Sequence, residues 1–264
     1  MKQKQLHILT VLVTLLLPNH LWADNLKKWD TFKVDGITYM VASKNPLEVN
    51  VGPSQYIGDE RNNKIKLSGA VPKDTTGSVI IPSSVIAPDG QQYAVTGISM
   101  NAFTECESIT SIAIPNTITN IGSYAFMGCK GLTSVTIPSS VKTIEYLAFG
   151  LCDELSSVVF DNSSPISIRT GMFAGSIFNA CGKLTSVYIK DLSAWCGNSF
   201  TNQNDSPVYW ASHCEGKKVH LFVNGVEVKV INLQAGSIQS ESGNTARFLF
   251  LVSESVVGVK RLFC

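Results

Sequence analysis

Charged side chains are scarce in this chain of 264 residues, because Lys, Arg, Asp and Glu make up only 16% of it. An average soluble domain carries about 25%. Serine, threonine and asparagine take the polar positions instead. The sequence contains no run of basic residues and no basic patch interleaved with aromatics. These absences exclude the usual signature of a nucleic-acid-binding protein.

Histidine is also rare, and only His213 and His220 occur after Ala23. A cysteine nucleophile requires a histidine as its base. Cys196, after a tryptophan and before a glycine, is a weak match to a papain-type nucleophile, and a buried cysteine with surface histidines is the favoured interpretation. A zinc site from His213, Cys214 and His220 has unsuitable spacing and no fourth ligand. We therefore expect no metal and no cofactor.

Acidic residues also provide no convincing catalytic pair. Glycoside hydrolases require two carboxylates across the scissile bond. The candidates Asp153, Glu154, Asp161 and Asp191 all lie at loop positions, where solvated charges are normal. No glycine-rich phosphate loop follows a strand. A secreted hydrolase is the least favoured function, and we expect the protein not to be an enzyme.

The N-terminal segment, residues 1–23, has the features of a signal peptide. Lys2 and Lys4 precede an apolar run over residues 6–17, and Ala23 is a small residue at the cleavage position. The run of about 12 residues is too short for the ~20 that span a bilayer. The mature chain has 19 basic and 20 acidic groups. It is predicted to be extracellular or associated with the cell surface, without an integral membrane segment.

A repeat with a period of about 23 residues organises positions 98–160. The segment Ile109-Thr-Ser-Ile-Ala-Ile-Pro115 returns as Leu132-Thr-Ser-Val-Thr-Ile-Pro138 and again as Leu155-Ser-Ser-Val-Val-Phe160. An Ala-Phe-x-x-Cys motif lies between the copies. A fixed period in the twenties is the signature of a solenoid, in which each unit buries one face against its neighbours.

Within each unit, a Val-x-Ile segment alternates with the period of a strand. Val135 and Ile137 are predicted to point inward, whereas Ser134 and Thr136 point outward, with successive copies side by side in one parallel sheet. Val141 and Ile144 are expected to turn the chain back across the core. The second motif supplies a structural ladder of buried residues: Phe103, Phe126, Phe149, Phe178, Cys106, Cys129, Cys152 and Cys181.

Seven cysteines in an exported chain raise the question of disulfides. Neighbours in the repeat column would lie close enough to bond. A pairing scheme does not explain why every copy has one cysteine, whereas a small buried space-filler does. We expect free thiols in the column. Cys196 and Cys214 are the better disulfide candidates, and their redox state stays open.

Other segments flank or interrupt the array. Asp35-Gly36 between alternating apolar residues predicts a hairpin cap, and Asn224-Gly225 predicts another hairpin. A six-residue insertion follows Asp161. The predicted divisions are a signal peptide at 1–23, a cap at 24–56, a solenoid at 57–230 with an extruded hairpin at 86–95 and a variant repeat at 191–230, and a divergent or truncated tail without visible strands at 231–264.

The Ala-Phe-x-x-Cys and Ile-Pro-x-x-Val motifs in fixed order resemble the BspA-like branch of the leucine-rich repeat family. The resemblance covers residues 79–230. It implies a right-handed curved solenoid with a parallel sheet on its concave face and little α-helix. It also implies a surface or secreted protein of an anaerobic bacterium that acts in adhesion or host-protein binding.

The predicted concave face carries short hydroxyl side chains at Ser111, Ser134, Thr136, Ser157 and Ser186. This composition favours binding without catalysis. Aromatic residues gather near the end of the array. Packing inside the variant repeat is their favoured interpretation, and stacking on a sugar or anchoring a partner protein is the functional alternative: Tyr188, Trp195, Tyr209 and Trp210. The predicted function is an adhesin-like module that binds an extracellular or host protein, or a glycan. A non-binding remnant or architectural fragment is the alternative.

Overall fold

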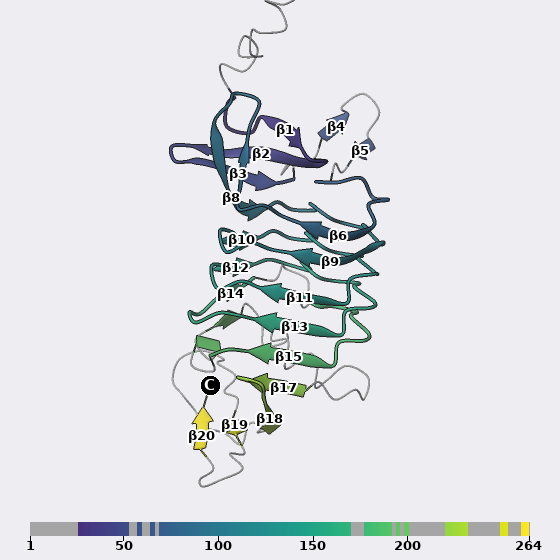
Figure 1. Ribbon diagram of the computed structural model, residues 1–264. Coiled ribbons are helices and arrows are strands. Elements are labelled where there is room, and N and C mark those ends of the chain that lie inside the picture. Colours follow the sequence, from purple (N-terminus) through teal and green to yellow (C-terminus); the bar gives the residue numbers. More distant parts are fainter. Residues whose placement is uncertain are drawn as a thin grey trace, which may run out of the picture.

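The computed structural model describes residues 26–52, 57–59, 64–66, 69–169, 177–191, 194–195, 198–200, 220–231, 249–252 and 260–263. In these ranges the regular elements are strands, and helix is confined to residues 194–195. The strands stack along one axis below a cap (Figure 1). The predicted architecture, a β-rich repeat solenoid with parallel strands and little α-helix, is confirmed.

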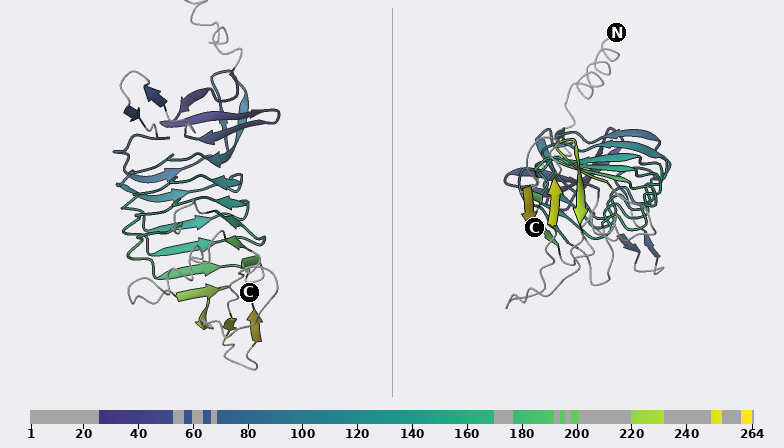
Figure 2. Two further views of the ribbon diagram at one scale, coloured as in Figure 1. Left: turned by 180° about the vertical axis from the view of Figure 1, so that it is seen from behind. Right: turned by 90° about the horizontal axis from the view of Figure 1, so that it is seen from below.

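Four of the repeats contribute two strands each, and the two strands lie on different walls of the array (Figure 2). The first strands are β6 (Gly77–Ile80), β9 (Ile109–Ala113), β11 (Ser134–Ile137), β13 (Ser157–Phe160), β15 (Ser186–Ile189) and β17 (His220–Val223). The second strands are β10 (Asn120–Ile121), β12 (Thr143–Ile144), β14 (Ser167–Ile168) and β16 (Ser199–Phe200).

Period-two alternation shapes the first strand of each repeat. In β11, Val135 and Ile137 are buried, and Ser134 and Thr136 are exposed, as the sequence predicts. Pro138 follows directly and has no N–H to continue the ladder, so the strand ends there. The inward side chains of one repeat pack against those of the next, and each repeat therefore depends on its neighbours for burial.

The first strands pair in parallel, but not in one unbroken sheet. The register holds from β11 to β17, so equivalent residues of successive repeats lie side by side. β6 pairs only with β9. Between β9 and β11, the Thr133 N–H donates to the Thr110 carbonyl at 3.3 Å. The predicted parallel strands are therefore present on this wall, in two sheets that this backbone hydrogen bond joins.

The second strands form another parallel sheet, which the sequence analysis did not predict. Ile121, Ile144 and Ile168 occupy equivalent positions and are 0% exposed. Ile144 was expected only to turn the chain, yet it belongs to β12. A strand of two residues is too short to display a detectable alternation, so the sequence pattern did not reveal it.

The N-terminal cap is antiparallel and continues the second sheet. Its strands are β1 (Thr31–Val34), β2 (Ile37–Lys44) and β3 (Leu47–Val51). β1 and β2 pair around Asp35 and Gly36, where the sequence predicts a turn. β3 was not anticipated. It pairs antiparallel with β2 and parallel with β8 (Gln92–Ile98). The cap therefore covers the end of the core through continuous hydrogen bonding.

Gly97 lies at the junction between the cap and the array. Its partners are Asn50 in β3 and Asn120 in β10. A Cβ atom on Gly97 would lie 2.5 Å from Asn50 Oδ1 and 2.6 Å from Asn120 Oδ1. Glycine is therefore required where the two asparagine side chains converge over the strand.

The hairpin predicted at residues 86–95 is present but is not extruded. It consists of β7 (Ser84–Ile86) and β8 (Gln92–Ile98). β8 runs between β3 and β10 within a nine-stranded sheet. In the turn, Asp89 accepts a hydrogen bond from the Tyr93 hydroxyl at 2.8 Å and forms an ion pair with Lys44 at 3.4 Å. These contacts join the hairpin to the cap.

Antiparallel strands also occur outside the repeats. They are β4 (Ile57–Asp59), β5 (Lys64–Lys66), β18 (Val226–Ile231), β19 (Leu249–Val252) and β20 (Lys260–Phe263). β18 pairs with β17 around Asn224 and Gly225, where a hairpin is predicted. β19 and β20 extend the same sheet, although residues 247–264 show no strand alternation in the sequence. The predicted signal peptide lies outside the described residues.

A column of stacked aromatic rings runs through the core. Phe103, Phe126, Phe149 and Phe178 are at most 1% exposed. Consecutive ring centroids lie 5.1, 5.0 and 5.5 Å apart, with nearly parallel planes. This spacing is close to the ~4.8 Å separation of paired strands. Each ring therefore packs against the equivalent ring of the next repeat.

The repeat cysteines form a second buried column, and the four in the described residues are free thiols. Three donate their S–H to the phenylalanine carbonyl of the preceding repeat: Cys129 to Phe103 at 3.2 Å, Cys152 to Phe126 at 3.2 Å and Cys181 to Phe149 at 3.0 Å. Burial raises the pKa of the Cys106 thiol to about 11 and that of Cys129 further. A neutral thiol that fills space and satisfies a carbonyl accounts for one cysteine in each repeat.

Candidate functional site

Two columns of side chains point outward from the first strands, and we call them together the outward strip. One column consists of hydroxyls and ends in an imidazole: Ser78, Ser111, Ser134, Ser157, Ser186 and His220. The other column is apolar at both ends: Ile80, Ala113, Thr136, Val159, Tyr188 and Phe222. All five hydroxyl residues selected from the sequence belong to this strip.

The outward strip carries no charged side chain between β6 and β15, and ion pairs border it. Each pair joins two consecutive repeats, and its side chains are about half exposed: Lys130 with Glu107 at 2.7 Å, Lys183 with Glu154 at 2.6 Å and Lys190 with Asp161 at 2.8 Å. The first two pairs precede the strands, and the third follows them. A neutral surface therefore lies between two charged margins.

The aromatic end of the outward strip consists of two half-buried rings that stack on each other. The centroids of Tyr188 and Phe222 lie 4.6 Å apart, with an interplanar angle of 14°. Two rings that lay edge to edge in one plane could not have their centroids 4.6 Å apart, so Tyr188 and Phe222 stack face to face along the array. His220 lies 6.5 Å from the Phe222 centroid and pairs with Glu227. The flat faces of the two rings cover each other and leave no open platform between them.

Trp195 does not belong to this surface. Its side chain is 6% exposed and packs edge to face against Phe160, with centroids 4.9 Å apart. This position fits the packing interpretation, which the sequence favours over ligand contact, and it removes Trp195 from the candidate binding surface. Tyr209 and Trp210 lie outside the described residues. The structure thus brings Tyr188 together with Phe222 and separates it from Trp195.

The described residues contain no cluster of three metal-ligating side chains. Of the candidate carboxylates, Glu154 and Asp161 are held in lysine ion pairs on the two margins of the outward strip. Cys196, His213 and Cys214 lie outside the described residues, so the two cysteines stay disulfide candidates only. Within the described ranges, no helix is long and apolar enough to cross a membrane.

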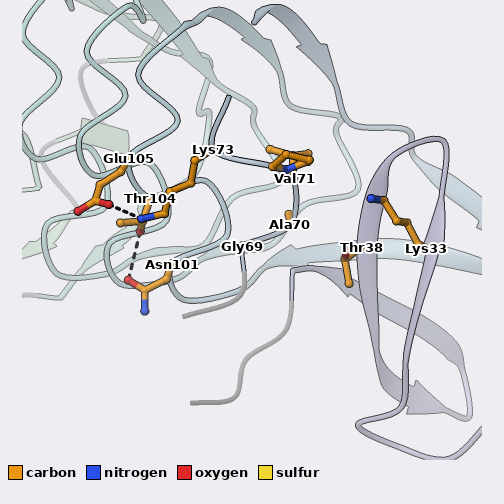
Figure 3. A pocket seen from close by; sticks show the side chains of 10 residues that line it. Lys33, Thr38, Gly69, Ala70, Val71, Lys73, Asn101, Thr104 and Glu105 are labelled. Carbon is orange, nitrogen blue, oxygen red and sulfur yellow. Dashed lines mark hydrogen bonds and ion pairs between the residues drawn. The ribbon is translucent and has the colours of Figure 1, made fainter. Parts of the chain in front are cut away.

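Another concave feature lies between the cap and the first repeat, and we call it the cap cleft. Its volume is about 430 Å³. Lys33 and Thr38 project from the β1–β2 hairpin, and Asn101 and Glu105 lie on the opposite wall (Figure 3). A hydrogen bond from Lys73 lowers the pKa of the Glu105 carboxyl. These residues are distant in sequence and form no motif, so sequence reasoning could not assemble them.

Sequence reasoning also missed two ends of the outward strip, Ile80 and Phe222. Ile80 is 70% exposed at one end. At the other, β17 repeats the alternation of the earlier strands, because Leu221 pairs with Val187 and is 1% exposed. In the sequence this segment is expected as a hairpin within the variant repeat at 191–230 and is not aligned with the earlier repeat strands. An irregular distance from the preceding copy concealed the fact that the same strand is also a repeat strand.

Comparison with protein families matches residues 96–229 to the BspA type leucine-rich repeat region, in six copies. The match covers about half of the chain, from β8 into β18. It contains the phenylalanine and cysteine columns and most of the outward strip. The cap cleft lies mostly outside the matched residues.

Several solved structures resemble the chain. A leucine-rich repeat protein from Bacteroides capillosus is 27% identical, with a TM-score of 0.43, over 61% of this chain and 99% of that one. For the T. pallidum leucine-rich repeat protein the values are 21%, 0.43, 60% and 71%. For a leucine-rich cell surface protein from Faecalibacterium prausnitzii they are 23%, 0.38, 65% and 47%. No curated protein matches the sequence.

Proposed function

The chain belongs to the BspA-type leucine-rich repeat family, and we propose that it is an exported, non-catalytic binding module. Its contact surface is the outward strip, and its partner is an extracellular or host protein. The observation that carries this proposal is the uncharged face that runs across consecutive strands between two margins of ion pairs.

The composition of the outward strip supports protein binding. Protein–protein interfaces are depleted of charge at their centre, enriched in aromatic residues and bordered by a polar rim. Ser134 and Thr136 are exposed in the middle of the strip, and Tyr188 and Phe222 are half-buried at one end. Short side chains on paired strands cost little conformational entropy on binding. The strip is therefore suited to a broad contact.

A protein partner is favoured over a glycan because of the ring geometry. Sugar recognition by stacking uses an open aromatic face, whereas Tyr188 and Phe222 cover each other at 4.6 Å. Their edges and the tyrosine hydroxyl remain for contacts with side chains of a partner. Glycan binding by the strip is an outcome that the experiment below tests.

Export is part of the proposal and depends on residues 1–23. Two lysines, an apolar run over residues 6–17 and Ala23 match the three parts of a secretory signal. N-terminal sequencing of the protein recovered outside the producing cells tests this point. We expect the mature chain to begin at Asp24.

The binding proposal is tested by capture with the purified mature chain. Panels of extracellular-matrix proteins and of glycans are probed with the wild type and with Thr136→Lys. An unpaired ammonium at the centre of the strip must be desolvated on contact, so we expect affinity for a bound protein to fall by about tenfold or more, corresponding to at least ~1.4 kcal/mol.

Thr143→Lys is the matched control, because Thr143 lies on the second sheet, in β12. It introduces the same charge into a strand of the opposite wall. Equal losses with both variants, or capture of glycans alone, would contradict the proposal. Failure to capture any protein from the panels would favour the architectural alternative.

A further inference from the structure

The cap cleft is braced by backbone hydrogen bonds from both sides. The Thr38 N–H donates to the Ala70 carbonyl at 2.8 Å, and the Ala70 N–H donates to the Ala102 carbonyl at 2.5 Å. The floor of the cleft is thereby tied to the cap on one side and to the first repeat on the other. Binding in such a site requires little ordering of the protein, which favours affinity for a small ligand.

One cation in the cap cleft lacks an anionic partner. Lys33 and Thr38 are paired across β1 and β2, so their side chains share one face of the hairpin. Lys33 forms no ion pair within the described residues, whereas Lys73 is paired with Glu105. Figure 3 shows the Lys33 ammonium directed from the hairpin toward Val71. The cleft therefore has an excess positive charge on the cap side.

The remaining lining offers neutral hydrogen-bonding groups and an apolar floor. The Thr104 hydroxyl donates to the Tyr124 carbonyl at 2.7 Å and lies 3.2 Å from Asn101 Oδ1. The single hydroxyl proton of Thr104 goes to the Tyr124 carbonyl, so the Asn101 amide keeps hydrogen-bonding capacity for a ligand. Val71 and Pro72 provide apolar surface beside it. A ligand that complements the cleft has one carboxylate, several hydroxyls and an apolar face.

We propose that the cap cleft binds an acidic sugar of the uronic acid class. The carboxylate is held by Lys33, and the ring hydroxyls by Thr38, Asn101 and the Lys73–Glu105 pair. The volume of about 430 Å³ falls within the range of small-ligand sites, roughly 300–1,000 Å³. This site goes beyond the proposed protein contact, because it is formed by the cap and carries charge.

A sugar acid fits better than an acidic peptide because the cleft holds an anion of its own. Glu105 is 55% exposed at its side chain, despite its pairing with Lys73. A second or third carboxylate on a peptide would approach Glu105 and be repelled. Sugar hydroxyls, by contrast, both donate to a carboxylate and accept from an ammonium.

The test is titration calorimetry of the mature chain with three probes: methyl galacturonoside, neutral methyl galactoside and an acetylated, amidated triglutamate peptide. We expect methyl galacturonoside to bind at least about tenfold more tightly than methyl galactoside, since only the acidic sugar offers a carboxylate to the Lys33 ammonium. Lys33→Gln should remove that preference, and salt should weaken binding because the ammonium is exposed.

Lys142→Gln is the matched control, because Lys142 is an exposed lysine beside β12 and outside the cleft. Equal binding of the acidic and neutral sugars, stronger binding of the peptide, or equal losses in both lysine variants would overturn the proposal. Absence of methyl galacturonoside binding would overturn it as well. Protein capture by the outward strip should be unaffected by Lys33→Gln, so failure of either proposal is distinguishable from failure of the other.

Discussion

The inward and outward faces of the same strands follow different rules. Inward, β11, β13 and β15 place valine at equivalent positions in Val135, Val158 and Val187, each at most 2% exposed. Outward, the column changes from Thr136 to Tyr188 within two repeats. Close packing against an identical neighbour requires the same shape in every copy. The solvent imposes no such requirement, and variation there is free to serve recognition.

The backbone shows the same contrast in another form. The residue before each repeat cysteine has a positive φ, although its identity changes: Glu105 (59°), Gly128 (73°), Leu151 (57°) and Ala180 (58°). Three of these four are not glycine. The turn therefore recurs because the buried cysteine column that follows it recurs. The residue at the turn adopts the left-handed conformation whatever its side chain.

The largest predicted effect is on the phenylalanine column. Phe126→Ala removes a ring that stacks on Phe103 and Phe149 at 5.1 and 5.0 Å. The cavity should lower the free energy of unfolding by about 3–5 kcal/mol, measured by denaturant titration. Tyr188→Ala, a half-buried ring on the outward face, should cost only about 0.5–1.5 kcal/mol. Similar losses in both variants would contradict the division between the two faces.

A second prediction concerns pH and the cysteine column. Burial raises the pKa of Cys106 to about 11 and that of Cys129 further, whereas an unfolded thiol titrates near ~8.5. Above pH ~8.5 the unfolded chain releases protons that the folded chain retains, so the free energy of unfolding should fall as pH rises. Each thiol contributes at most about 1.4 kcal/mol per pH unit.

The control for this prediction is the double variant Cys106→Ala, Cys129→Ala. Its denaturation midpoints between pH 7 and 10 should decline less steeply than those of the wild type. Burial also raises the pKa of Tyr39, to about 12, but an unfolded tyrosine titrates only near ~10. Identical slopes in the two proteins below pH 10 would exclude the thiols as the cause.

A third, smaller effect is expected at the left-handed turn. A non-glycine residue in this conformation destabilises the folded state by about 1–2 kcal/mol. Replacing it with glycine removes this strain, but the greater conformational entropy of glycine in the unfolded chain offsets part of the gain. Leu151→Gly should therefore stabilise the protein by up to about 1 kcal/mol. Gly128→Ala should destabilise it by a similar amount. A Cβ on Gly128 meets no atom closer than 3.5 Å, so conformation is the cause.

Sequence patterns predicted the parts of this fold that depend on local alternation. The inward valines, the phenylalanine and cysteine columns and the hydroxyls of the outward strip all follow from the repeat period. The second sheet escaped prediction because its strands have only two residues. For Trp195 the sequence favours packing over ligand contact, but a residue in an irregular segment gives no indication of which residue it packs against. The cap cleft depends on tertiary contacts between residues 33, 73 and 105, which no spacing rule joins.

The smallest predicted effect is the sharpest test of the comparison. Thr136→Ala and Thr136→Lys alter an exposed side chain of β11, so the free energy of unfolding should change by no more than about 0.5 kcal/mol. Ile137→Ala, at the adjacent buried position, should cost about 2–5 kcal/mol. If Thr136→Lys also unfolded the array, loss of partner binding in that variant would carry no information about the surface. Preserved stability instead means that the inward side chains of β11 determine folding and its outward side chains determine recognition. Either set can then be altered without affecting the other.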